Sequence, residues 1–252
     1  MAIELQTLCA YADELMQVER YEDYCPNGLQ VEGRAVITRI ASGVTASQAL
    51  LDEALAWGAD AILVHHGYFW KGEAQTVVGI KRARLAALLA ADASLIAYHL
   101  PLDDHPQLGN NARFGELLGI AVETQQPLPQ AQVGAMGRLA AATTCASLVD
   151  KIAALTARQP LLIGNPQAMV HSVAWCTGAA QGYIDAAVAA NVDLYITGEV
   201  SEQTVHVARE SGMQFISAGH HATERYGVQA LGEALAVHFG LEHRFFDVHN
   251  PV

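Results

Sequence analysis

The strongest constraint on the fold is a pattern of strands and helices that occurs twice along the chain. A shift of 133 positions places residues 44–66 over residues 177–199. In both copies an apolar run, a turn of small residues, an amphipathic helix and a second apolar run follow in the same order. Apolar strands that alternate with helices are typical of α/β proteins with largely buried sheets. The chain is therefore predicted to be an α/β protein.

The two copies agree in detail as well as in order. Asp60 precedes the apolar run 61–64, and Asp193 precedes the run 194–197. The helical stripe is Leu50, Leu51, Ala54 and Leu55 in one copy and Tyr183, Ile184, Ala187 and Val188 in the other. Two further strand-like runs, 95–98 and 215–218, are each followed by His-x-x-x-acid and a helix.

We therefore expect an internal duplication that gives two similar α/β units. The first unit is predicted in residues 1–125, with elements from the C-terminal end allowed to complete it, and the second in residues 126–252. The Pro-containing polar stretch 125–129 suits a linker between them. The alternative is a chance likeness between two α/β segments, because any alternation of helices and strands produces part of this match.

Composition excludes several classes of protein. Hydrophobic residues make up 52% of the chain and charged residues 16%, which is typical of a globular core. We expect no membrane partner and a cytoplasmic location, because the apolar windows are too short for a bilayer and no signal peptide is visible. The four cysteines form no Cys-x-x-Cys pair and are expected to be reduced. Binding to nucleic acid is not expected, since the net charge is −12 with only 14 lysines and arginines.

Potential metal ligands gather just past the carboxyl ends of the predicted strands, where open α/β sheets bind ligands. The first copy supplies His65, His66, His99 and Asp103, and the second supplies Glu199, His220, His221 and Glu224. Imidazole and carboxylate donors without thiolate suit zinc, iron or manganese. The i, i+4 pair of His220 and Glu224 opens a predicted helix and lies on one of its faces. The set as a whole predicts a metal site.

Simpler interpretations stay open for single residues. Successive side chains of a strand point to opposite faces, so His65 and His66 should diverge, with Gly67 allowing the chain to turn. His99 could cap a strand end, and Asp103 could lie in a solvated turn. The pair 110–111 is expected to cap the following helix. The aromatic run 68–70 suits either the core or an oligomer contact, or a stacking wall over a metal-bound substrate.

Six short motifs carry a resemblance to a known family. They are Tyr-Cys-Pro-Asn-Gly-Leu-Gln-Val at 24–31, Gly-Val-Thr-Ala-Ser at 43–47, Val-His-His-Gly at 64–67, His-Leu-Pro-Leu-Asp at 99–103, Thr-Gly-Glu at 197–199 and Gly-His-His-Ala-Thr-Glu at 219–224. Along essentially its whole length the sequence resembles the Nif-three-like proteins, also labelled GTP cyclohydrolase type 2 homologues, in their close bacterial branch. Many relatives carry proline where this chain has Gly67.

The resemblance implies two divalent metal ions per chain, of iron, zinc or manganese, in the cleft between the two units. It implies that His65 and Asp103 bind one ion, that His66 and His220 bind the other, and that Glu224 bridges both. It places His99 beside the first ion, either as a further ligand or as a hydrogen-bond partner of the ligands. It also implies a homohexamer, a toroid with the metal centres facing an inner cavity.

The function expected from this site is metal-dependent hydrolysis, with a metal-bridging hydroxide as the nucleophile. His99 or Glu199 is the expected proton shuttle, since each follows a predicted strand near the ligands. The substrate is expected to be a small molecule such as a phosphoester, a cyclic amidine or a nucleotide. No Gly-x-x-x-x-Gly-Lys-Ser loop is present to hold a triphosphate. The alternative is a non-enzymatic hexameric scaffold or regulator, which needs the same ligands but no open coordination position.

Overall fold

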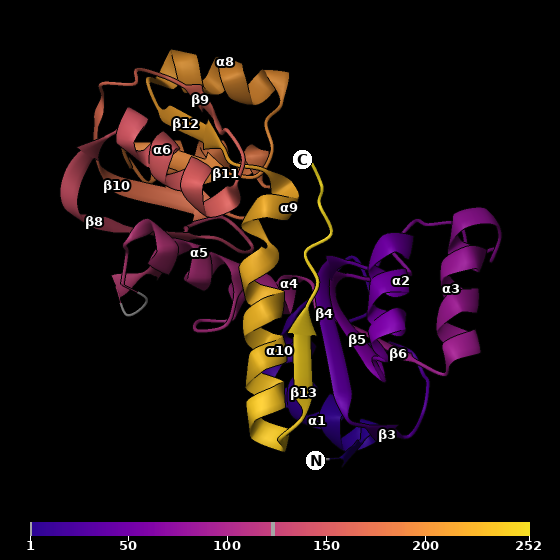
Figure 1. Ribbon diagram of the computed structural model, residues 1–252. Coiled ribbons are helices and arrows are strands. Elements are labelled where there is room, and N and C mark those ends of the chain that lie inside the picture. The colour runs from indigo at the N-terminus through magenta and orange to yellow at the C-terminus, as the bar shows by residue number, and fades with distance from the viewer. Residues whose placement is uncertain (1, 122–123) are drawn as a thin grey trace. The chain divides into compact units, whose positions relative to one another are not determined.

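The computed structural model describes residues 2–121 and 124–252, whose strands form three sheets in a mixed α/β protein (Figure 1). The chain divides into two units. Unit 1 consists of Met1–Leu102 and Gly227–His249, and unit 2 of Asp103–Tyr226 and Asn250–Val252. The chain leaves unit 1 within the short helix α4 (Leu100–Asp104) and returns within α10 (Arg225–Phe239).

Unit 1 is built on a five-stranded sheet. In order across the sheet its strands are β13 (Glu242–Phe245), β4 (Arg39–Thr45), β5 (Ala61–His66), β6 (Ser94–Ala97) and β2 (Gly28–Val31). The first four run parallel and β2 is antiparallel to β6. A separate antiparallel pair joins β1 (Ile3–Glu4) and β3 (Val36–Ile37). Since β5 and β6 are parallel, their carboxyl ends lie at the same edge.

Helices cover this sheet with apolar side chains. They are α1 (Leu5–Met16), α2 (Gln48–Trp57), α3 (Gly79–Ala91) and α10, with a 3-10 turn η1 at Val18–Arg20. Ser47 begins α2 as expected of an N-cap, since its hydroxyl accepts the Leu50 N–H. The buried core joins α2 and α3 to one face of β4, β5 and β6, and Figure 1 shows these two helices side by side. The continuous apolar runs thus became central, fully buried strands, as predicted.

Unit 2 is built on a six-stranded sheet. Its order is β7 (Gln126–Pro127), β8 (Ala135–Thr144), β10 (Met169–Cys176), β11 (Leu194–Thr197), β12 (Gln214–Ser217) and β9 (Leu161–Ile163). The central strands β10, β11 and β12 are parallel, and their neighbours are antiparallel. The carboxyl ends of these three strands therefore share one edge.

Two apolar layers cover the faces of the unit 2 sheet. The helices are α5 (Asn110–Leu118), α6 (Cys145–Thr156), α7 (Ile184–Ala189), α8 (Glu202–Ser211) and α9 (His220–Thr223), with a 3-10 turn η3 at Gln181–Tyr183. One core joins α5 and α6 to the sheet around Trp175, and the other joins α7 and α8 to Tyr195 and Phe215. Figure 1 shows α8 beside β9 and β12.

The acid before the second strand of each copy braces its sheet in the same way. Asp60 Oδ2 accepts hydrogen bonds from the Thr38 N–H at 2.8 Å and the Thr38 hydroxyl at 2.7 Å. Asp193 Oδ2 accepts them from the Ser172 N–H at 2.7 Å and the Ser172 hydroxyl at 2.8 Å. Burial opposes ionisation of both carboxyls, but these donors hold the pKa of each below its usual value.

All four cysteines are buried free thiols. Among the helices of residues 2–121 and 124–252, none combines the length and the apolar character needed to cross a bilayer.

Candidate metal-binding site

Three histidines converge at the carboxyl edge of the unit 1 sheet. His65 and His66 end β5, and His99 follows β6 by two residues. Their ring centroids lie 4.5 Å apart for His65 and His66, 5.1 Å for His65 and His99, and 5.8 Å for His66 and His99. One ring nitrogen from each lies within 4.8 Å of the other two. Three imidazole nitrogens at this spacing could hold a metal ion.

Each of these imidazoles is oriented through its Nδ1 atom. His65 Nδ1 lies 3.0 Å from the Tyr98 carbonyl oxygen, and His66 Nδ1 lies 3.1 Å from the Thr45 hydroxyl. Because a carbonyl oxygen only accepts, the proton of neutral His65 is on Nδ1 and the lone pair is on Nε2. Metal-binding histidines typically have their second ring nitrogen held in this way, which fixes the tautomer and the ring plane.

The carboxylate of Asp23 anchors the His99 imidazole. Its Oδ1 lies 2.7 Å from His99 Nδ1, and its Oδ2 accepts the Leu100 N–H at 2.9 Å. Asn27 completes the arrangement, since its side chain accepts the His99 N–H at 2.7 Å and donates to Asp23 Oδ2 at 2.9 Å. Burial opposes ionisation of Asp23, but the hydrogen bonds from His99 and Asn27 keep its pKa below the usual value. The ionised carboxylate therefore fixes the proton of His99 on Nδ1.

The donors of this cluster favour a nitrogen and oxygen ligand set. Cys25 also approaches Asp23 and His99, with one donor atom from each within 4.8 Å. Burial raises the pKa of the Cys25 thiol to about 12, and the charge of Asp23 adds to this shift. Without a bound metal the Cys25 thiol is therefore protonated near neutral pH. Imidazole and carboxylate groups fit divalent zinc, iron or manganese.

A second cluster lies at the carboxyl edge of the unit 2 sheet. Glu199 follows β11, and α9 begins at His220 after β12. His220 Nδ1 lies 2.7 Å from Glu199 Oε1, and His220 Nε2 lies 3.2 Å from Glu224 Oε2. Burial disfavours the charged imidazole, but the two carboxylates outweigh it and raise the pKa of His220 to about 9. Through its contact with Nδ1, Glu199 orients the His220 ring in the same way as Asp23 orients the His99 ring.

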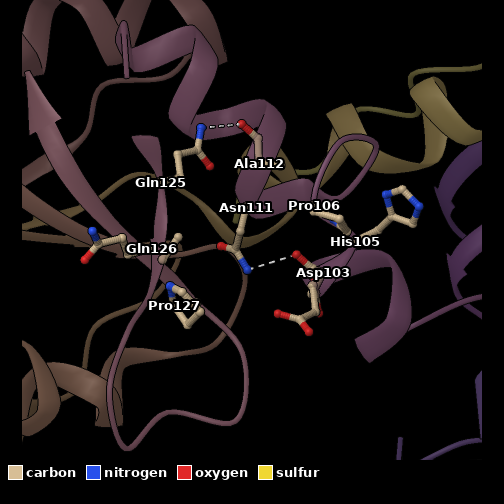
Figure 2. Close-up of a pocket in the computed structure, with 11 residues that line it drawn as sticks. Asp103, His105, Pro106, Asn111, Ala112, Gln125, Gln126 and Pro127 are labelled. Atoms are coloured by element: carbon tan, nitrogen blue, oxygen red, sulfur yellow. Dashed lines mark hydrogen bonds between the residues drawn. The ribbon is translucent and has the colours of Figure 1, made fainter. Parts of the chain in front are cut away.

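Asp103 is a buried carboxylate at the same edge. Its Oδ1 accepts the Asn110 amide at 2.9 Å and lies 3.4 Å from the Thr177 hydroxyl. Figure 2 shows the Asn111 amide donating to the main-chain oxygen of Asp103, at 3.1 Å. The solvated-turn interpretation of Asp103 is thus wrong, because the residue is only 6% exposed.

The expected cap at 110–111 is also wrong. Gly109 precedes α5, and no side-chain bond caps the helix there. Asn110 and Asn111 are buried instead and hold Asp103, while Asn111 Oδ1 accepts the Thr177 N–H at 3.0 Å. Asparagine side chains near a helix start can bond either to the first N–H groups of the helix or to other nearby partners. Here both amides donate to oxygen atoms of Asp103 instead.

Asp103 and Glu224 both lie beside the turn that follows β10. Thr177 of this turn contacts Asp103, and Gly178 contacts Glu224. Both carboxylates act on the buried Cys176 thiol, whose pKa is raised by burial first and then by their charges. Gly178 packs directly on the second carboxylate: a Cβ there would lie less than 3.0 Å from Glu224 Oε1 and 3.3 Å from His220 Nε2. Only glycine allows this approach, and its φ of 72° favours glycine as well.

A pocket of about 130 Å³ lies beside Asp103 in unit 2. Asp104, Asn111, Gln126 and Pro127 are among the residues that line it, and Figure 2 shows the last two across from Asp103. The pocket offers space for a small molecule beside the Asp103 segment.

Sequence reasoning missed Asp23, Thr45 and Gly178. Asp23 immediately precedes the motif at 24–31, and that position was its only signal. Gly178 aligns with Thr45 in the repeat, so the turns at these two positions were the places to search. Gly67 directly follows the last residue of β5, where the chain leaves the sheet. It does not have a positive φ, and a Cβ there would come close to the Gln30 side chain and to Ala97.

The fold and both clusters define an α/β protein with imidazole and carboxylate groups gathered at sheet edges. The family model Duf34/NIF3 (NGG1p interacting factor 3) matches residues 3–251, and the chain belongs to this family. The resemblance seen in the sequence is thereby confirmed.

Curated relatives match along the whole chain. The GTP cyclohydrolase 1 type 2 homolog of Pseudomonas aeruginosa is 56% identical over 252 residues, covering 100% of both chains. The protein of the same name from Escherichia coli K12 is 51% identical over 242 residues, covering 95% of this chain and 96% of its own.

Solved structures share the fold. One, described as protein ybgI of unknown function, has a TM-score of 0.94 and 48% identity, and covers 99% of this chain and 100% of its own. A protein from Thermus thermophilus has a TM-score of 0.90 and 31% identity with the same coverage.

Proposed function

We propose that the chain binds two divalent metal ions and catalyses metal-dependent hydrolysis of a small molecule. The observation that carries the proposal is the shared anchoring of the histidines. His65, His66, His99 and His220 each have Nδ1 within 3.1 Å of an oxygen atom. Such anchoring fixes the tautomer and the ring plane, which a metal-binding histidine needs at His65, His66 and His220 and a proton-transferring histidine needs at His99.

The proposed ligands are those implied by the family resemblance. His65 and Asp103 hold one ion, His66 and His220 hold the other, and Glu224 binds both, with iron, zinc or manganese as the metal. Burial of the two carboxylates supports this assignment, because buried carboxylates are normally paired with cations or coordinate metals.

When bound, the two divalent ions would supply Lewis acidity and would lower the pKa of a coordinated water molecule. The chain itself supplies orientation and proton transfer. Asp23 fixes the ring plane and the tautomer of His99, as the carboxylate of a hydrolase triad does for its histidine, which makes His99 the first candidate for proton transfer. Glu199, whose side chain is 34% exposed, holds His220 and is the second candidate for proton transfer.

The substrate class follows from the names of the relatives and from the charge of the chain. The name GTP cyclohydrolase 1 type 2 homolog, borne by relatives about 50% identical, supports a cyclic amidine or a nucleotide as substrate. With a net charge of −12 and 14 lysines and arginines, the chain offers little help to a triphosphate unless the metals bind it. Cyclic amidines, nucleosides and simple phosphoesters therefore come first in a screen.

The experiment removes metals with a chelator, restores manganese, zinc or iron singly, and measures bound metal and hydrolysis together. We expect two ions per chain and turnover that returns with one of the metals. His66→Ala should mainly empty one position, whereas Glu224→Gln should weaken both. His206→Ala is the matched control, since His206 lies exposed on α8.

Equal loss of both ions in His66→Ala would contradict the ligand assignment. Two bound ions without turnover on any of the three substrate classes would contradict hydrolysis and favour the non-enzymatic scaffold.

A further inference from the structure

We propose that Tyr24 and Trp70, here called the aromatic wall, stack against a flat nitrogen heterocycle bound beside the unit 1 histidines. This assignment rests on the proposed function, because it names the substrate class of the same site. Both rings belong to unit 1, and both contact the imidazole of His99.

Trp70 is held with its ring against two of the histidines. Its ring centroid lies 5.0 Å from that of His99, nearly perpendicular at 86°, and 6.0 Å from that of His66. Two hydrogen bonds fix the residue: the indole N–H donates to the Gly67 carbonyl at 3.2 Å, and the main-chain N–H donates to Glu73 Oε2 at 3.1 Å. With its only polar group satisfied within the loop, the indole offers an apolar surface to a ligand.

The backbone before Trp70 is strained. Phe69 has a φ of 65°, a conformation that costs free energy for a bulky side chain and is rarely adopted without compensation. The compensation is visible: the Lys81 ammonium lies 5.1 Å from the Phe69 ring, and the Tyr68 ring meets it edge-on. Strained residues that the surroundings hold in place gather at ligand sites. Here the strained residue directly precedes the indole.

Tyr24 is tied to the same loop. Its ring is 55% exposed and lies 6.3 Å from that of His99. Its carbonyl accepts the Lys71 N–H at 2.6 Å, and its own N–H donates to Asp23 Oδ1 at 2.6 Å. The hydrogen bond from Lys71 joins the segment of Tyr24 to the residue after Trp70. Both aromatic rings are thus positioned beside one imidazole before any ligand binds.

The chemistry of the wall selects an unsaturated ring. Aromatic side chains stack on the π-face of any flat base, and such stacking tolerates different bases. Nitrogen atoms of the ring suit the same metals that imidazoles bind. The nearby cation Lys81 is engaged by Glu73 at 3.4 Å and is only 13% exposed. The wall itself therefore selects the flat base of a ligand.

Calorimetric titration of the metal-loaded, full-length protein tests the proposal. The probes are guanosine, adenosine and uridine, with ribose as the ligand that lacks a flat ring. We expect at least one nucleoside to bind and ribose not to bind. Trp70→Leu should weaken that nucleoside about tenfold, whereas Trp70→Phe should stay within about threefold. Tyr24→Ala, which alters an exposed side chain, should weaken it about fivefold.

Trp57→Leu is the matched control, because Trp57 is a half-buried tryptophan of unit 1 that packs on Phe246 and lies under Arg39. It should bind nucleosides as the wild type does. Wild-type affinity in both Trp70→Leu and Tyr24→Ala would overturn the proposal. So would ribose binding as tightly as the nucleosides, or no nucleoside binding to the wild type. If nucleoside binding depends on Trp70 but no metal-dependent turnover is found, the aromatic wall is supported and the hydrolase proposal is contradicted.

Discussion

Gly178→Ala is the substitution that most directly tests the carboxylate cluster of unit 2. A Cβ at this position would lie less than 3.0 Å from Glu224 Oε1, so the carboxylate must move. Moving it breaks the contact with His220 Nε2 at 3.2 Å, and a hydrogen bond between charged partners contributes about 1.5–3 kcal/mol. The positive φ of 72° adds roughly 1–2 kcal/mol for a residue with a Cβ. Together the substitution should cost about 3–5 kcal/mol.

Gly212→Ala separates these two contributions. Gly212 has nearly the same φ, 77°, but no atom lies within 4 Å of a Cβ there. Its variant should therefore lose only the roughly 1–2 kcal/mol of backbone strain. The assay is urea unfolding of the metal-free proteins, followed by metal analysis after reloading. Gly178→Ala should bind less metal and Gly212→Ala the wild-type amount. Equal losses of stability in the two variants, with unchanged metal in both, would refute the reasoning.

Three further predictions concern the braces, the histidine anchors and the assembly. The folded pKa of Asp60 is lowered, so its stabilisation is complete above its unfolded pKa of about 3.9 and is lost as the pH falls through the folded value. Asp60→Asn should thus cost roughly 3 kcal/mol at pH 7 and much less near pH 2, measured by urea unfolding at each pH. Glu199→Gln should weaken metal binding about 10–100-fold in a chelator competition, because it removes the charge that orients His220, and wild-type affinity would reject that role. Light scattering should give six times the chain mass of 26.9 kDa if the homohexamer is correct, and a monomer or dimer would exclude it.

Local sequence patterns were enough to predict the central strands. The run 61–64 lies within β5, and the run 194–197 is β11 itself. Both are continuous apolar segments that parallel sheets bury on two faces, so their composition leaves few alternatives. Because the strands are parallel, the polar residues that follow them were expected at the same edge of each sheet. Fold class and the list of candidate ligands could therefore be read from the sequence.

The orientation of those ligands could not be read, because it depends on contacts between distant residues. Strand alternation predicts that His65 and His66 diverge, yet their ring centroids lie 4.5 Å apart. Pairing of β5 with β4 ends at His66, opposite Thr45, and beyond that point the pleat no longer fixes side-chain directions. The Asp23 carboxylate that orients His99 lies 76 positions earlier in the chain. No periodicity connects residues so far apart.

The predicted repeat places different polar residues at the strand ends of its two copies. The shift of 133 positions that maps Asp60 onto Asp193 also maps His65 and His66 onto Gly198 and Glu199. The braces at the starts of the strands have an aspartate as acceptor in both units, although the hydroxyl donors Thr38 and Ser172 differ by one position under this shift. At the strand ends the chemistry differs, since unit 1 presents imidazoles and unit 2 mainly carboxylates. The braces hold the sheets themselves, whereas the polar residues after the strands are sites that those sheets position.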